Sequence, residues 1–354
     1  MIEVDYLIVG CGFAGLSFIE EAKAHNKSVL VFDNQSQQSS TVAGGMYNPV
    51  VLKRFTAVWK SQEQLKLALP FYKNLEVKLN ITVDYKLPVY RRFVSTEEQN
   101  NWFAASDKVN VGEFISTTLI KNTNAHINAD FGFGEVLQTG RVDSALLMAS
   151  YRAYLKRNGE LVERPFLYKA LEPTASGFMY QDYKIKHVVF AEGFGLKQNP
   201  FFNYLPLQGS KGELLIIHAP ELNINFLLKS SVFVMPLGND LYKVGATYER
   251  DDKTNNTTEA GKNQLLSKLK SFITCDFEIV DQVAGVRPTV KDRRPLIGAH
   301  PEHKHMFILN GLGSRGVLIG PYVAKQLYNA IENGGELDTE IDIKRYESDY
   351  ASIS

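Results

Sequence analysis

The chain has 354 residues, of which 44% are hydrophobic and 22% are charged, and its 39 basic and 39 acidic residues give a formal net charge of zero. This composition is ordinary for a globular protein, and the length predicts two interleaved domains. The balanced charge disfavours a protein that grips nucleic acid nonspecifically, because such proteins usually carry a basic excess.

The two cysteines, Cys11 and Cys275, are too few for a disulfide framework or a zinc site, so we expect no metal. The chain begins Met1–Asp5 and leads directly into an apolar strand, which predicts a cytoplasmic protein without a signal peptide. No apolar run approaches the ~20 residues that a membrane span needs.

The first 33 residues predict a strand, a glycine turn, a helix and a second strand. Tyr6–Val9 is a short apolar run, typical of a buried parallel strand. The turn is Gly10–Gly15, the helix covers 16–24, and the second strand covers 28–32 and ends at Asp33. This is a βαβ unit of the expected size.

The glycine turn has the GxGxxG pattern of a dinucleotide-binding site. Gly10 permits the tight turn, Gly12 allows the backbone to approach a pyrophosphate, and Gly15 allows helix and strand to pack closely. The start of the helix offers N–H donors and partial positive charge to the phosphates. Asp33 stands where a carboxylate accepts hydrogen bonds from ribose hydroxyls, and it disfavours a 2′-phosphate.

Beyond Asp33 the pattern continues with mixed helices and strands. A polar loop leads into a second glycine segment, Ala43–Met46, and Asp143 is a suitable N-cap for a later helix. Helices are predicted over 59–79 with a break at Pro70, over 143–157 and over 259–273, and strands over 83–93, 161–171 and 186–191.

The pattern changes after residue 205. Strands over 212–218, 231–236 and 241–248 alternate in character, which predicts an antiparallel sheet in a second domain. A last buried strand over 306–309 leads into another glycine turn, Gly311–Gly316, and a helix over 317–331. We therefore expect an α/β (α+β) fold with a discontinuous nucleotide-binding domain of 1–80, 140–200 and 280–354, and a substrate-binding domain of 81–139 and 201–279.

Two widely separated glycine segments, besides the first turn, favour FAD over NAD, because they suit a long cofactor that ends in a tricyclic ring. The chain resembles the D-amino-acid oxidase (DAO) family of FAD-dependent oxidoreductases, which includes glycine oxidase, sarcosine oxidase and the oxidase module of a bifunctional tRNA methylaminomethyl-uridine enzyme. The resemblance rests on Gly10–Gly15 with Asp33, Ala43–Met46, Gly140–Asp143, Val188–Gly193, Val244–Thr247, Gly285–Gly298 and Asn310–Gly320.

The resemblance implies a Rossmann-like FAD domain of the glutathione-reductase type and a large, mostly antiparallel substrate-domain sheet. The helix after Gly311–Gly316 would point its N-terminus at the flavin, and Ala43–Met46 would border the other side. The expected cofactor contacts are Gly10, Gly12, Phe13, Ala14, Gly15, Asp33, Asn34, Thr41, Ala43, Gly44, Gly45, Met46, Phe166, Ala191, Glu192, Gly193, Arg287, Gly311, Leu312, Gly313, Ser314, Arg315, Gly316 and Val317. No cysteine occurs from 285 to 316, so the FAD is expected to be non-covalent.

The substrate contacts also follow from the resemblance. Arg287 would pair with a substrate carboxylate and aim the adjacent C–H at flavin N5 for hydride transfer, unless it forms a structural salt bridge. Phe233, Tyr248 and Ser314, with Arg315 adjacent, stand where glycine oxidase has other residues. Lys243 aligns with a lysine that activates oxygen in sarcosine oxidase, or it is an edge-strand lysine in solvent.

Three functions follow from these residues. The first is oxidation of a C–N bond in a small amino acid or N-substituted amino acid, with oxygen, a quinone or a carrier protein as electron acceptor. The second is a stand-alone tRNA-modifying oxidase that removes a carboxymethyl group from a modified uridine. The third is a non-catalytic FAD-binding protein.

Overall fold

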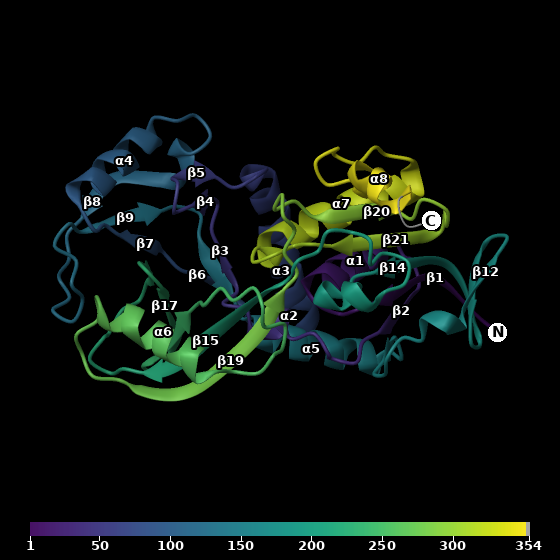
Figure 1. Cartoon of the computed structure of the whole chain (residues 1–354), viewed down its shortest axis with the longest axis horizontal. Helices are drawn as coiled ribbons and strands as arrows, with labels where there is room; N and C mark the ends of the chain where they lie inside the picture. Colours follow the sequence, from purple (N-terminus) through teal and green to yellow (C-terminus); the bar gives the residue numbers. More distant parts are fainter. Residues whose placement is uncertain (352–354) are drawn as a thin grey trace.

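The computed structural model describes residues 1–351, which form two lobes built around two large sheets (Figure 1). The first lobe contains both chain ends, and the second contains α4 (Thr96–Ser106) and α6 (Glu259–Lys270). The chain passes between the lobes several times, so neither lobe is one continuous segment of the sequence.

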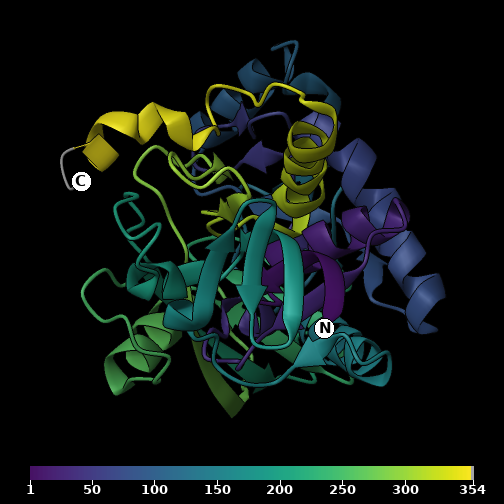
Figure 2. The same cartoon turned by 90° about the vertical axis from the view of Figure 1, so that its right-hand side faces the viewer.

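The first sheet has a parallel centre. Its strands are, in order, β11 (Leu161–Val162), β2 (Val29–Phe32), β1 (Ile2–Val9), β14 (Tyr183–Phe190), β13 (Gly177–Tyr180) and β12 (Leu171–Thr174), with β21 (Met306–Asn310) also on β14 and β20 (Leu296–Ala299) on β21. Strands β11, β2, β1, β14 and β21 run parallel, and the β12–β14 meander is antiparallel. Figure 2 shows this teal meander facing the viewer.

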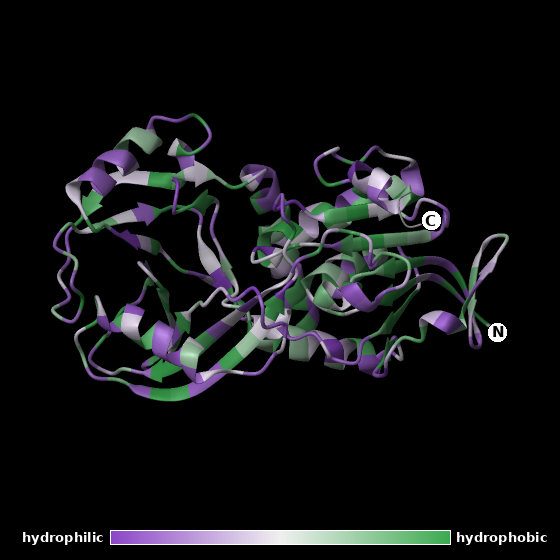
Figure 3. Ribbon diagram, in the orientation of Figure 1, coloured by the Kyte–Doolittle hydropathy of each residue, from purple (hydrophilic) through white to green (hydrophobic). Residues whose placement is uncertain are grey.

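Both faces of the central strands of the first sheet are buried, which explains the unbroken apolar runs Tyr6–Val9, Val29–Phe32 and Val188–Phe190. Tyr6 and Ile8 face one hydrophobic cluster, which they share with α1 (Phe13–Ala24) and α7 (Gly316–Asn333), whereas Leu7 and Val9 face another. Green, hydrophobic residues accordingly mark α7 and the central strands in Figure 3.

The second sheet is antiparallel except where β16 meets β7. Its order is β19 (Glu278–Arg287), β15 (Ser210–His218), β18 (Leu241–Gly245), β17 (Phe233–Gly238), β16 (Leu227–Lys229), β7 (Val89–Arg92), β9 (Phe133–Val136) and β8 (Ile115–Ile120). One face packs Leu215, Val234 and Val244 against Leu265 and Leu269 of α6. The opposite face is turned toward the first lobe, because Phe233 and Lys243 on that face reach Gly44 and Ala43.

Within residues 1–351, the remaining helices and strands are α2 (Ser39–Val42), α3 (Ser61–Leu79), α5 (Ser144–Arg157), α8 (Glu347–Ala351), the three-stranded sheet of β3 (Met46–Tyr47), β10 (Gly140–Val142) and β6 (Asp84–Lys86), and the pair β4 (Val50–Val51) and β5 (Thr56–Ala57). Short 3₁₀ turns cover 112–114, 168–170, 193–198 and 343–346.

The α/β fold, the first βαβ unit and the antiparallel second sheet are confirmed. The break at Pro70 is wrong, because α3 continues through it. Buried contacts of Leu65, Tyr72 and Leu75 offset the lost backbone hydrogen bond. The single strand predicted over 83–93 is two strands in different sheets, β6 and β7.

Two other expectations need correction. The predicted strand over 161–171 is only β11 and the first residue of β12, with a 3₁₀ turn before the latter. Residues 280–287, expected in the nucleotide-binding domain, lie in β19 and pair with β15 of the second sheet. The rest of the proposed domain division stays a prediction.

Candidate active site

The first glycine turn lies between the ends of β1 and β14. Gly10 has φ +100°, and a Cβ there would lie 2.5 Å from the Ala191 carbonyl oxygen. A Cβ on Gly15 would lie 2.0 Å from the Gly10 carbonyl oxygen. Gly12 is the N-cap of α1, whose first turn has neither a side-chain cap nor an acidic residue. The packing thus requires glycine, and the helix start keeps N–H donors for an anion.

Asp33 is held at the end of β2 by three donors. The Cys11 N–H donates to Oδ2 at 2.9 Å, Arg152 Nη1 donates to the same oxygen at 2.6 Å, and the Gln35 N–H donates to Oδ1 at 2.7 Å. No local sequence pattern points to Arg152 as a partner of Asp33, because Arg152 lies 119 residues away on α5. The neighbouring Asn34 accepts from the Ser36 N–H at 3.1 Å, on the surface.

The segment Thr41–Met46 lies between the glycine turn and the second sheet. Just before it, Ser40 Oγ accepts from the Phe13 N–H at 3.1 Å, which places α2 over the glycine turn. Ser144 Oγ donates to the carbonyls of Thr41 at 3.3 Å and Ala43 at 2.9 Å. Gly45 has φ +72°, and a Cβ there would lie 1.9 Å from the Val142 carbonyl oxygen.

The C-terminal glycine turn brings the start of α7 beside the start of α1. Gly311 and Gly313 have φ of +73° and +59°, and the Gly313 N–H donates to the Pro288 carbonyl at 2.9 Å. A Cβ on Gly316 would lie 3.2 Å from Phe13 Cβ. Like α1, α7 has neither a side-chain cap nor an acidic residue in its first turn.

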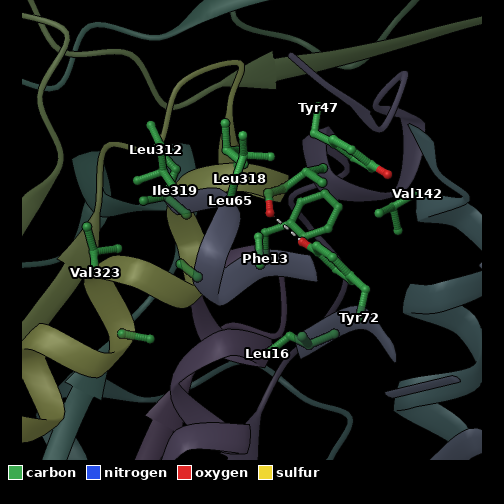
Figure 4. Packing of buried hydrophobic residues seen from close by; sticks show 14 of the residues in the cluster. Phe13, Leu16, Tyr47, Leu65, Tyr72, Val142, Leu312, Leu318, Ile319 and Val323 are labelled. Carbon is green, nitrogen blue, oxygen red and sulfur yellow. Dashed lines mark hydrogen bonds between the residues drawn. The ribbon is translucent and has the colours of Figure 1, made fainter. Parts of the chain in front are cut away.

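Buried side chains fix this arrangement of helix starts (Figure 4). The Tyr72 hydroxyl of α3 donates to the Val317 carbonyl at 2.6 Å. Leu65 of α3 and Leu318 and Ile319 of α7 belong to the same buried cluster as Phe13. The two positive helix ends are therefore set rigidly by the core.

Ala191–Gly193 completes the backbone around the first turn. Glu192 accepts from the Tyr168 hydroxyl and, at 2.7 Å, from Asn199 Nδ2, and burial raises the pKa of its carboxyl to about 7. Asn310 Nδ2 donates to the Gly193 carbonyl at 2.9 Å, which ties this segment to the end of β21.

Phe166 lies in an aromatic cluster behind β2. Its ring stacks on Tyr180 at a centroid distance of 4.6 Å and meets Phe32 edge-on at 5.7 Å. The side chain is therefore a core residue, and a contact between its backbone and adenine stays a prediction.

Taken together, these segments fit FAD. Two helix starts without a capping side chain at their N-cap residues lie side by side, and three backbone segments pack too closely for side chains, as a long cofactor with a pyrophosphate requires. The residues that would hold the pyrophosphate and ribose are Gly12, Ala14 and Asp33, since the Phe13 N–H already donates to Ser40 Oγ. Those that would border the ring are Gly44, Gly45 and the start of α7.

Arg287 lies at the end of β19, on the sheet face turned toward the first lobe. Its guanidinium lies over Gly212, donates to the Thr247 carbonyl at 3.3 Å and stacks on the Tyr248 ring at 4.6 Å. No acidic side chain in residues 1–351 forms an ion pair with it, so a structural salt bridge is not what holds it. Burial lowers the pKa of this guanidinium.

Arg315 is a second guanidinium, on a partly buried residue, without an ion pair to any described residue. Its Nη1 donates to the Asn48 carbonyl at 2.9 Å, and burial lowers its pKa to about 10. The Tyr248 phenol acts electrostatically on both Arg287 and Arg315, so Tyr248 lies near each of the two guanidinium groups. Ser314 is exposed, and Asn48 belongs to no motif that would have pointed to the site.

Lys243 and Phe233 extend from the second sheet to the segment Thr41–Met46. Lys243 Nζ donates to the Ala43 carbonyl at 3.1 Å, and burial lowers the pKa of the ammonium. Its strand, β18, lies between β15 and β17, so the edge-strand interpretation is wrong. The Phe233 ring lies 3.1 Å from where a Gly44 Cβ would stand. Tyr248, by contrast, is 71% exposed.

The fold and the paired glycine turns define an FAD-dependent oxidoreductase. A family model described as "DAO: FAD dependent oxidoreductase" matches residues 5–330, and the chain belongs to this family, as its sequence predicted.

Named relatives match over part of their length. The chain is 24% identical to glycine oxidase of Geobacillus kaustophilus over 167 residues, which are 46% of this chain and 43% of that protein. It is 25% identical over 181 residues to the tRNA 5-methylaminomethyl-2-thiouridine biosynthesis bifunctional protein of Shewanella halifaxensis, covering 40% of this chain and 28% of the relative. The crystal structure of the Geobacillus glycine oxidase superposes with a TM-score of 0.80 at 19% identity, covering 98% of each chain.

Among residues 1–351, no helix is both long and apolar enough to cross a membrane. Within the same range, no three His, Cys, Asp or Glu side chains gather as a metal site would require.

Proposed function

We propose that this protein oxidises the C–N bond of a small amino acid or N-substituted amino acid, with non-covalently bound FAD. The observation that carries the proposal is Arg287, a largely desolvated guanidinium on a partly buried residue, without a carboxylate partner in the described chain, on the sheet face that also reaches Ala43 and Gly44. An unpaired buried cation is costly, and a ligand carboxylate would offset that cost.

Arg287 is placed to bind and orient such a carboxylate. Gly212 leaves room for the guanidinium, because any Cβ there would lie 1.9 Å from Nη2. The Thr247 carbonyl and the Tyr248 ring fix its plane, and a fixed fork holds a carboxylate through two parallel hydrogen bonds. Arg315, near the same Tyr248, adds positive charge beside it.

The surrounding side chains orient the reacting carbon and exclude water. The Phe233 ring packs against Gly44 and Gly245, which gives the site an apolar wall on the cofactor side. Lys243 and the start of α7 add positive charge and N–H donors near the segment that would border the ring. When bound, FAD would accept the hydride from the carbon next to nitrogen, leaving an imine that water hydrolyses.

Non-covalent binding is supported by the positions of both cysteines. Cys11 is buried under the glycine turn beside Asp33, and Cys275 lies in the hydrophobic cluster under α6. Neither lies on the Arg287 face of the second sheet.

A second candidate is oxidation of a carboxymethylaminomethyl group on tRNA, which the Shewanella relative's name suggests. The chemistry is the same, since an amine again stands beside a carboxylate, and Arg287 would serve both substrates. The balanced charge favours the small substrate, because proteins that bind nucleic acid usually carry a basic excess.

The test is anaerobic mixing of the FAD-loaded protein with a panel of N-methyl, D- and L-amino acids. We expect at least one to bleach the flavin absorbance, and Arg287→Ala to raise KM strongly while FAD stays bound. Bleaching by modified tRNA alone would favour the second candidate. No uptake of FAD, or an unchanged KM in the variant, would contradict the proposal.

A further inference from the structure

Lys229 is a third cation on the sheet face that carries Arg287. It ends β16, opposite Phe233 of β17, and Phe233 lies opposite Gly245 of β18. Residues directly opposite on neighbouring strands point to the same face, so Lys229 shares the face of Phe233. On β15, Leu214 lies opposite Gly245 and therefore points to the same face. Ser210 is four residues before Leu214, so it shares this face, and so does Arg287, which lies opposite Ser210.

No hydrogen bond or ion pair from residues 1–351 engages the Lys229 ammonium. Its Nζ lies over the Phe233 ring, 5.6 Å from the centroid. The nearby charged groups that act on it are Arg91, Arg287 and Lys268, all positive, and Arg91 is itself paired with Glu98. The side chain is partly buried. A lysine in such surroundings lacks the anion that would normally accompany it.

The spacing suits a second acidic group on the substrate. Neighbouring strands lie ~4.8 Å apart, and β16 is two strands away from β18, so Lys229 stands about 10 Å across the sheet from β18. The Arg287 guanidinium reaches the Thr247 carbonyl, just after the end of β18. The Phe233 ring lies between the two cations and also packs against Gly44. A ligand held at Arg287 and extended over Phe233 would therefore reach Lys229.

We propose that Lys229 binds a second carboxylate of the substrate, so that the enzyme acts on amino acids with two acidic groups, carried on the side chain or on an N-carboxyalkyl arm. This inference rests on the proposed function, in which Arg287 binds the first carboxylate. Lys229 thereby selects among carboxylate-bearing amines.

The test compares glutarate with valerate, which have equal carbon chains but two and one carboxylates. Each is titrated at pH 7 into the FAD-loaded protein, and the dissociation constant is read from the change in flavin absorbance. We expect glutarate to bind at least about tenfold more tightly than valerate. Lys229→Met should bring the ratio close to one, and Lys229→Arg should keep most of it.

Lys304→Met, a change of an exposed lysine between β20 and β21, is the matched control and should leave the ratio unchanged. Equal binding of the two acids by the unmodified protein, or a ratio that survives Lys229→Met, would overturn the role of Lys229. If the role of Lys229 is overturned in this way but Arg287→Ala loses valerate binding, the proposed function still stands. If neither acid binds at all, both proposals fail.

Discussion

Replacing Lys229 by Met should stabilise the protein at neutral pH. Burial among Arg91, Arg287 and Lys268 lowers the Lys229 pKa from 10.5 to about 8. Each pKa unit corresponds to 1.36 kcal/mol, so keeping this ammonium charged costs at most about 3 kcal/mol. Methionine retains the apolar contact with Phe233 without the charge, and we expect a gain in the free energy of unfolding of about 1–3 kcal/mol.

The sign of the pH dependence follows from linkage. Between pH 8 and 10.5 the unfolded chain binds more protons at this lysine than the folded chain, so stability rises with pH there. The advantage of Lys229→Met is therefore full below about pH 8 and disappears as pH approaches 10.5. The assay is urea unfolding of the FAD-loaded protein at a series of pH values.

Lys211 supplies the control for this experiment. It is also buried, but it ion-pairs with Asp252 and lies 3.8 Å from Glu213. Lys211→Met leaves Glu213 buried without its cation, and we expect a loss of about 3–5 kcal/mol. A loss of stability in Lys229→Met at pH 7, or a gain that does not change with pH, would refute the reasoning.

Three further predictions concern the cofactor side. Gly45→Ala forces a Cβ against the Val142 carbonyl at positive φ, and it should cost about 1–3 kcal/mol and lower FAD content, measured by thermal unfolding and absorbance. Burial raises the pKa of the Glu192 carboxyl to about 7, so the unmodified protein should lose stability as pH rises from about 4.5 to 7. Glu192→Gln should remove this loss, and identical profiles of unfolding free energy against pH for the two proteins would contradict the prediction. Lys243→Met should slow reoxidation of the reduced protein by oxygen at least about tenfold in stopped flow, if the ammonium near Ala43 stabilises superoxide; an unchanged rate would remove Lys243 from that role.

Local signals predicted the cofactor half of the molecule well. The order of strand, glycine turn, helix and acid over the first 33 residues needs no long-range information, because each feature is set by neighbours in the chain. The same holds for Asp143, whose side chain caps α5 by accepting from the Leu146 N–H at 3.1 Å.

Features set by distant contacts were missed or misread. The sequence around Lys243 is compatible with an edge strand, because a local sequence pattern does not determine the order of strands in a sheet. In the structure, β18 lies inside the second sheet, between β15 and β17. β19 was missed because six of its ten residues are only partly buried or exposed before residue 284, which hides the alternation of a strand. Lys229 follows two leucines and looks like the end of an apolar strand; only the pairing of β16 with β17 places it beside Phe233.

The central claim is that Arg287 binds the carboxylate of an amine substrate beside FAD. The most direct test is anaerobic reduction of the FAD-loaded protein by a bleaching amino acid found in the panel and by the amide of that same amino acid. We expect the acid, below saturation, to reduce the flavin about 100-fold faster than its amide, and Arg287→Met to abolish the difference. Equal rates for acid and amide in the unmodified protein would contradict the claim.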